Sequence, residues 1–148
     1  MQAKNIQLAI FDWDGTLFDS NSIVMRAHHM SIQHFQLSKE TDEQIEENQL
    51  GKDSLTVSKY MVRNTTVAAV DYQQFFRQAY QRELKILIAK QATLIFPNSI
   101  GTVRALYEQG IQCAVATNKP RETAEPEIQS SGLLPYLSDC QYADETQS

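Results

Sequence analysis

Cysteine is scarce in this sequence, in which Cys113 and Cys140 are the two that occur among 148 residues. Two cysteines do not make a disulfide framework, and their separation does not match the spacing of metal-binding cysteines. Both lie within or beside apolar segments. We therefore expect two buried free thiols.

Long hydrophobic runs are also missing, since no apolar stretch approaches the length that a helix needs to cross a bilayer. The first eleven residues include Lys4 but have neither a long apolar core nor a small-residue cleavage site, so we expect no secretory signal. The sequence predicts a cytoplasmic protein with no membrane partner.

An excess of positive charge is absent as well. The 13 Lys and Arg residues are outnumbered by 18 Asp and Glu, which gives a formal net charge of -5. Binding to a phosphate backbone needs clustered basic residues, so we expect no nucleic-acid partner. An anionic small substrate would require a local positive site. With 42% apolar and 21% charged residues, the chain has the composition of one ordinary globular domain.

The most informative segment that is present spans residues 12–20 and reads DWDGTLFDS. It follows the apolar run 6–11, which predicts a buried strand. Side chains two residues apart share a face of an extended chain, so Asp12 and Asp14 can address one reacting atom. Gly15 lets the backbone turn beside a ligand. This arrangement of carboxylates favours covalent phosphoryl transfer.

Between residue 19 and about residue 93 the sequence has a helical periodicity and no convincing strand. Thr41 followed by Gln44 is typical of the N-terminus of a helix, and Asp53 or Ser54 is expected to begin the next helix. The predicted helices span 22–35, 41–48, 53–63 and 71–90. We expect an all-helical insert in this part of the chain.

After Phe96 and Pro97 the pattern alternates between helix and strand. Gly110 and Gly132 are each placed to end a helix. The predicted elements are helix 99–109, strand 111–116, helix 121–131 and a short strand 137–142. Strands alternating with helices imply right-handed crossovers and a parallel sheet, so we expect an α/β fold.

With these elements in place, the sequence resembles the haloacid dehalogenase-like (HAD) superfamily, and within it the phosphoglycolate-phosphatase-like branch. Segment 12–20 matches that branch's first motif, and AVATNKPR at 114–121 looks like its second. The stretch FFRQAY at 75–80 and the Phe96-Pro97 pair also resemble the family. The resemblance covers almost all 148 residues.

The resemblance implies a Rossmann-like parallel core sheet, incomplete with about three strands, and an inserted all-helical cap. The core would consist of residues 1–19 and 94–148, and the cap of residues 20–93. The implied function is a Mg²⁺-dependent phosphatase that hydrolyses a small phosphorylated metabolite, similar to phosphoglycolate, through an aspartyl-phosphate. A phosphomutase on the same scaffold is an alternative.

By the same resemblance, Asp12 is the nucleophile and Asp14 the general acid and base. Mg²⁺ would be held by the Asp12 carboxylate and the Asp14 carbonyl. Thr117 would hold a phosphoryl oxygen, with Asn118 beside it and with backbone N–H groups around Trp13 and Asp14 as further donors. An aspartate at position 14 favours phosphate esters over dehalogenation.

Lysines supply the positive charge that an anionic substrate needs. Lys119 could offset phosphate charge, and a water-facing lysine at a helix start is the alternative. Gly51 and Lys52 lie at a position that resembles the cap's substrate loop, where the alternative is a solvated loop. The three histidines have no metal-binding spacing and are expected to be ordinary helix residues: His28, His29 and His34.

The resemblance also implies segments beyond 142–145, a Lys-Pro-x-Pro stretch and a last acidic motif, which the printed sequence, ending at Ser148, does not include. We expect the first strand to have an unpaired edge, through which copies of the chain could associate. Three readings stay open: a chain cut short, a fragment completed by another copy or partner, and a short non-catalytic relative that binds phosphate ligands.

Overall fold

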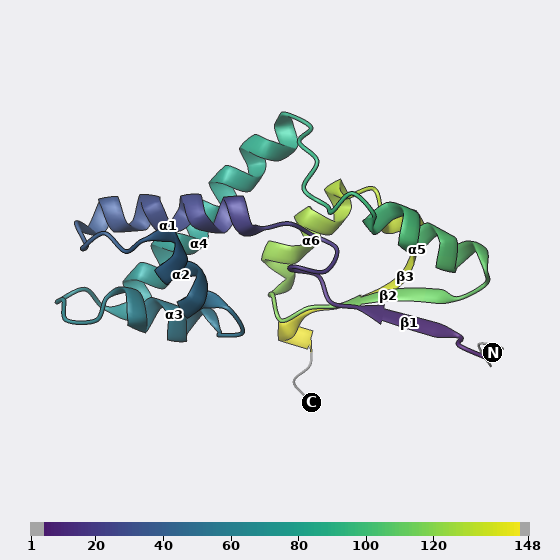
Figure 1. The fold of residues 1–148 in the computed structure, drawn as a ribbon, viewed down its shortest axis with the longest axis horizontal. Helices are drawn as coiled ribbons and strands as arrows, with labels where there is room; N and C mark the ends of the chain where they lie inside the picture. The colour runs from purple at the N-terminus through teal and green to yellow at the C-terminus, as the bar shows by residue number, and fades with distance from the viewer. Residues whose placement is uncertain (1–4, 146–148) are drawn as a thin grey trace. The chain divides into compact units, whose positions relative to one another are not determined.

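The computed structural model describes residues 5–145. The chain divides into two compact units: unit 1 comprises Met1–Ser20 and Gln91–Ser148, and unit 2 comprises Asn21–Lys90. Unit 1 contains the strands and unit 2 is helical in its described residues (Figure 1). None of the helices in this part of the chain is long and apolar enough to cross a membrane.

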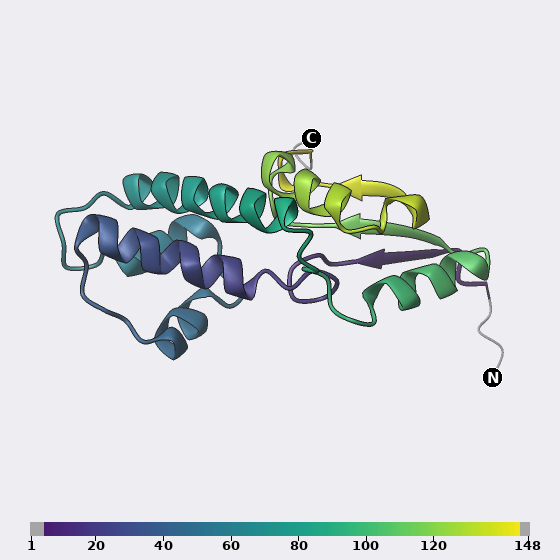
Figure 2. The ribbon, with the colours of Figure 1, turned by 90° about the horizontal axis from the view of Figure 1, so that it is seen from above.

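Unit 1 is built on a three-stranded parallel sheet with the order β1-β2-β3. Figures 1 and 2 show two helices, α5 and α6, over the same face of this sheet. Both crossovers step in the same direction, so right-handed connections place their helices on one side. The predicted α/β class is confirmed. The elements are β1 (Leu8–Phe11), α5 (Ser99–Glu108), β2 (Gln112–Ala116), α6 (Arg121–Ser130) and β3 (Leu137–Gln141).

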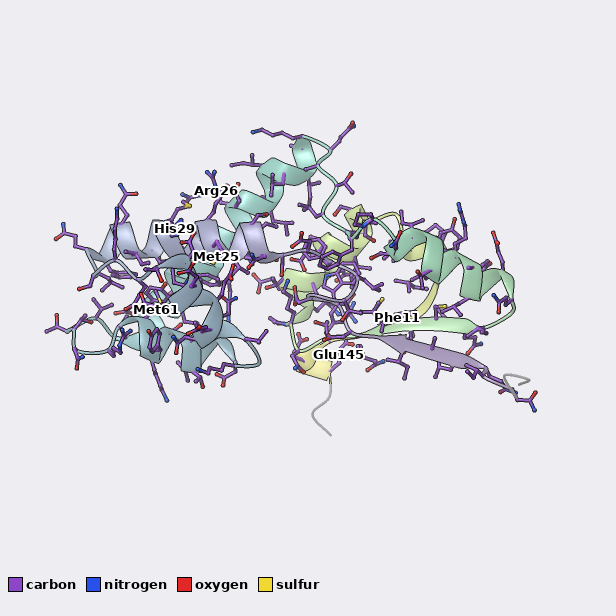
Figure 3. The ribbon with its side chains drawn as sticks, viewed as in Figure 1. Phe11, Met25, Arg26, His29, Met61 and Glu145 are labelled. Carbon is purple, nitrogen blue, oxygen red and sulfur yellow. The ribbon has the colours of Figure 1, made fainter. Side chains whose placement is uncertain are left out.

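The covered face of the sheet carries the apolar contacts of unit 1. Ala9 pairs with Cys113 and Phe11 with Val115, so these four side chains share a face. Cys113 and Val115 are buried there, and the Cys113 thiol lies 3.8 Å from the carbonyl of Val103 in α5. Figure 3 labels Phe11 at the end of β1, where the sheet meets the loop that follows it.

The prediction that the first strand is buried is wrong. Ile6, Leu8 and Ile10 are 60%, 48% and 63% exposed. Leu8 pairs with Gln112 and Ile10 with Ala114, which places them on the face opposite α5 and α6. In the described residues β1 is also an edge strand. An apolar run resembles a buried strand, but its local pattern does not reveal which faces are covered.

Both cysteines are free thiols, as predicted. Cys113 is buried and Cys140 is half-buried. Burial raises the pKa of each thiol above its ordinary value, so both favour the unreactive protonated form.

Unit 2 consists of four helices that follow their sequence signals closely. The capping box predicted at Thr41 and Gln44 is formed, and Asp53 accepts hydrogen bonds from the backbone N–H groups of Leu55 and Thr56, 3.0 Å each. These caps satisfy N–H groups that have no partner inside the helix. The helices are α1 (Asn21–Phe35), α2 (Asp42–Gln49), α3 (Ser54–Met61) and α4 (Ala69–Ala89).

The apolar faces of these helices form a common core. Met25 of α1 and Met61 of α3, both labelled in Figure 3, belong to it. His29 and Arg26 of α1 are labelled in the same view, and they pair with Asp42 and Glu83 at 2.8 and 3.0 Å. The buried members of the core are Met25, Ile32, Ile45, Val57, Met61, Val62 and Tyr72.

Candidate active site

A tight turn at the carboxyl end of β1 carries the two aspartates. The carbonyl of Trp13 accepts hydrogen bonds from the N–H groups of Thr16, Leu17 and Phe18 at 3.2, 3.0 and 3.0 Å. Gly15 adopts φ +74°, a left-handed conformation that suits glycine, and its N–H donates to the carbonyl of Phe18 at 2.9 Å. The turn therefore fixes the backbone on both sides of Asp14.

Asp12 and Asp14 differ in their surroundings. Asp12 is exposed, and its Oδ1 accepts a hydrogen bond of 2.8 Å from the backbone N–H of Trp13. Asp14 is half-buried, and its Oδ1 lies 2.7 Å from Nζ of Lys119. The turn after β1 and the loop after β2 thus meet through a close ion pair.

The loop after β2 is anchored to the end of β3. The N–H of buried Thr117 donates to the carbonyl of Gln141 at 3.0 Å, and the carbonyl of Lys119 accepts from the N–H of Ala143 at 3.0 Å. Thr117 Oγ1 accepts the N–H of Lys119 at 3.1 Å. Asn118, between them, is exposed.

The first turn of α6 is fastened to the same segment after β3. Arg121 donates its backbone N–H to Asp144 at 3.1 Å, and its guanidinium pairs with Glu145 and lies 4.5 Å from the ring centroid of Tyr142. Burial raises the pKa of Tyr142 to about 12, so this phenol stays protonated. Hydrogen bonds thus hold the loop that carries Lys119 at both of its ends, at Thr117 and at Arg121.

Lys119 does not face water as the alternative interpretation held. Its side chain is 18% exposed, and its ammonium lies between Asp14 and Glu127, 2.7 Å from the former and 2.8 Å from the latter. The ammonium also lies 5.4 Å from the ring centroid of Phe18. The lysine therefore brings positive charge to the aspartate turn.

Glu127 is a site residue that the sequence motifs do not include, and its side chain is completely buried. Its carboxylate accepts hydrogen bonds from the indole Nε1 of Trp13 at 3.0 Å and from Lys119. Helical periodicity could have indicated it, because one face of α6 holds Thr123, Ala124, Glu127 and Ile128, all buried. A glutamate on an otherwise small and apolar face needs buried partners.

Trp13 provides the packing under the site. Its indole is fully buried and stacks on Phe18, with ring centroids 5.2 Å apart and 13° between the planes. Phe18 is buried as well, so both rings pack in the interior of unit 1.

The remaining predicted residues, Gly51 and Lys52, belong to unit 2. Gly51 adopts φ +70° in the turn after α2, and Lys52 is exposed, with its N–H donating to the carbonyl of Gln49 at 3.2 Å. Their role towards a substrate stays a prediction.

The donor set at the aspartate turn fits Mg²⁺. This hard cation prefers oxygen and usually takes one or two carboxylates, with water and substrate phosphate oxygens completing its shell. The Asp12 carboxylate and the Asp14 carbonyl are two such oxygen donors, two residues apart in one turn. Among residues 5–145 no three His, Cys, Asp or Glu side chains form a group that could hold a metal ion.

The sequence is similar to those of known phosphate-hydrolysing proteins. A sequence model described as haloacid dehalogenase-like hydrolase matches residues 9–148. A phosphoglycolate phosphatase of Salmonella typhimurium is 25% identical over 162 residues, which cover 98% of this chain and 64% of the relative. A pyrophosphatase of Bacillus pumilus is 22% identical, over 100% of this chain and 64% of the relative.

A solved structure shows the same fold. The crystal structure of a predicted phosphoglycolate phosphatase from Haemophilus somnus superposes with a TM-score of 0.76 at 20% identity, covering 97% of this chain and 65% of that one. The chain thus spans slightly less than two thirds of the length of these relatives.

Proposed function

Because the chain belongs to the haloacid dehalogenase-like hydrolase family, we propose that it is a phosphatase that hydrolyses a small phosphorylated metabolite through an aspartyl-phosphate on Asp12. The observation that carries the proposal is the convergence of Asp14 with Lys119 at 2.7 Å, beside the exposed carboxylate of Asp12. This convergence puts a nucleophile, a proton carrier and a cation at one end of the sheet. Open α/β sheets bind their ligands at the carboxyl ends of the strands.

In the first step an Asp12 oxygen attacks phosphorus and the bond between phosphorus and the ester oxygen breaks. Asp14 donates a proton to the departing alkoxide. Water then attacks the phosphorus of the aspartyl-phosphate while Asp14 takes its proton, which releases phosphate and restores Asp12. Splitting the hydrolysis in this way replaces one difficult displacement by two easier ones.

Positioning and charge stabilisation dominate phosphoryl transfer. In this proposal Lys119 offsets the charge of the phosphoryl oxygens, and Thr117 donates its hydroxyl to one of them. Asn118 and the backbone N–H groups around Trp13 and Asp14 are further donors. Each of these groups follows β1 or β2.

We include Mg²⁺ as the cofactor, since the family generally uses it. The Asp12 carboxylate and the Asp14 carbonyl would hold it, and the bound ion would supply additional positive charge for the phosphoryl group.

Unit 2 is proposed to be the cap, with Gly51 and Lys52 in its substrate loop. A phosphoglycolate-like ester is the proposed substrate, because a relative that bears the name phosphoglycolate phosphatase aligns with 98% of this chain. We further propose a cytoplasmic location, where thiols stay reduced, since both cysteines are free.

The test is phosphate release from an aryl phosphate and from a panel of metabolites that includes phosphoglycolate, with and without Mg²⁺. We expect Mg²⁺-dependent release that Asp12→Asn lowers by at least about 1,000-fold, because the variant lacks the nucleophile. Glu108→Gln, which removes an exposed carboxylate at the end of α5, is the matched control and should leave the rate unchanged.

Folded wild-type protein that releases no phosphate from any panel member would contradict the proposal. That outcome would favour a non-catalytic module that binds phosphate ligands.

A further inference from the structure

Glu127 is a buried charge at the base of the proposed site. The residue lies in the middle of α6, its side chain has no exposure to solvent, and Pro126 precedes it inside the helix. Burying a carboxylate is costly unless charged and hydrogen-bonded partners compensate it. Apolar packing alone therefore does not account for a carboxylate at this position, and its partners have to be considered.

Two partners of Glu127, Trp13 and Lys119, lead towards the two aspartates. Oε1 accepts from the indole of Trp13 at 3.0 Å, and both carboxylate oxygens accept from the Lys119 ammonium, at 2.8 and 3.0 Å. Trp13 stands between Asp12 and Asp14 in the chain, and Lys119 pairs with Asp14. One carboxylate thus contacts both segments that form the site.

A lysine ammonium on its flexible four-carbon side chain has no fixed geometry of its own. The two contacts with Glu127 restrict the ammonium. Oε1 of Glu127 is in turn held by the indole of Trp13, which stacks on Phe18. This series of side-chain contacts is therefore rigid where it is buried, at Phe18 and Trp13. It ends in the ammonium of Lys119 beside Asp14.

We propose that Glu127 is a positioning residue that holds the Lys119 ammonium beside Asp14, where it meets the phosphoryl group. This inference rests on the proposed function and extends it to a residue outside the two motifs. A charge fixed before the substrate arrives needs no reorganisation during the reaction, and such preorganisation is a major source of catalysis.

The first arm of the test measures hydrolysis. Glu127→Gln keeps the shape and an acceptor for the indole but removes the charge that restrains Lys119. We expect kcat to fall on the order of 100-fold. Lys119→Met should cause a similar loss, and the double variant Glu127→Gln/Lys119→Met should be no slower than Lys119→Met alone, because both changes remove the same interaction.

The second arm needs no turnover. Binding of inorganic phosphate in the presence of MgCl₂ is followed through the indole N–H signal of Trp13, the single tryptophan of the chain. We expect Glu127→Gln to keep this signal but to weaken phosphate binding about tenfold, as loss of a charged contact would. Glu122→Gln, an exposed glutamate of α6, is the matched control and should bind as wild type does.

A purely structural role gives a different pattern. In that case Glu127→Gln would lower the unfolding midpoint while the folded protein kept its kcat and its phosphate affinity, which would overturn the proposal. If Glu127→Gln does not fold, Glu127→Leu/Lys119→Met replaces the buried pair by apolar groups of similar volume, a change that is often neutral. Phosphate affinity equal to that of wild type in this variant would also overturn the proposal.

The two arms separate this inference from the proposed function. Phosphate binding that depends on Glu127 and Lys119, without hydrolysis, would support the positioning role and contradict the phosphatase. Hydrolysis that is indifferent to Glu127→Gln would support the phosphatase and contradict the positioning role. A wild-type protein that neither binds nor releases phosphate would contradict both.

Discussion

At the scale of single residues, the site depends on side chains whose partners lie far away in the sequence. Asp12 and Asp14 could be singled out from the sequence because their motif is local. Glu127 belongs to no local motif, and helical periodicity could indicate only that it lies on the buried face of α6, unlike Glu122. Its role depends on Trp13, 114 positions earlier in the chain, and no short sequence pattern contains that contact.

His28, in unit 2, provides a testable prediction for a single residue. The histidine is buried, and its ring nitrogens lie 2.7 Å from the Tyr72 hydroxyl and 3.1 Å from Gln49 Oε1. Burial lowers its pKa to about 4 from an ordinary 6.5, although the hydrogen bond with Gln49 opposes the shift. The unfolded chain therefore takes up a proton at a higher pH than the folded chain does.

Protonation of His28 in the unfolded chain therefore lowers the free energy of unfolding as the pH falls from 6.5 towards 4. We expect the free energy of unfolding to drop by about 2 kcal/mol between pH 7 and pH 5 from this group, measured by urea titration followed by helical circular dichroism. His28→Gln should lose this part of the pH dependence, whereas the exposed His29→Gln should keep it. An equal pH dependence in His28→Gln and wild type would contradict the assignment.

At the scale of elements, local sequence signals determined most of the structure. The helix predicted at 22–35 is observed at Asn21–Phe35, and the strand predicted at 111–116 is observed at Gln112–Ala116. Caps and glycines explain this agreement, because they act within a few residues of the helix ends. The exposure of Leu8 in β1 was missed because burial depends on which helices cover a face, and that depends on the whole topology.

The capping box of α2 provides a prediction for a single element. Thr41 Oγ1 accepts the N–H of Gln44 at 3.2 Å, and the Gln44 side chain accepts the N–H of Thr41 at 2.8 Å. Thr41→Ala should lower the free energy of unfolding of unit 2 by about 1 kcal/mol. Thr102→Ala, an exposed threonine inside α5, is the control, and its change should be close to zero. Equal effects of the two substitutions, measured by urea unfolding, would count against the cap.

At the scale of the whole molecule, the open face and edge of β1 lead to a proposal about association. Leu8 and Ile10 of β1, together with Ile6 just before it, form an exposed apolar stripe at the edge of the described sheet. Such edges pair with other chains unless charge or cover protects them. We propose that copies of this chain associate through β1.

Light scattering coupled to size exclusion tests this proposal. The mean mass should rise with protein concentration, and Ile10→Lys should reduce the rise because it places a charge in the stripe. Leu50→Lys is the control, since Leu50 is 85% exposed but lies on unit 2, outside the stripe. A constant monomer mass for wild type at high concentration would contradict association through β1.

The central claim is that Asp12 carries the phosphoryl group, and trapping that group tests it most directly. Asp14→Asn should slow hydrolysis of the intermediate, because Asp14 takes the proton of the attacking water. After incubation of the variant with an aryl phosphate, whose leaving group departs without a proton from Asp14, and Mg²⁺, followed by an acid quench, mass spectrometry of the peptide that contains residues 8–20 should locate one phosphoryl group on Asp12. Phosphate release by wild type with the label on any other residue, or with no labelled residue in the variant, would contradict the account.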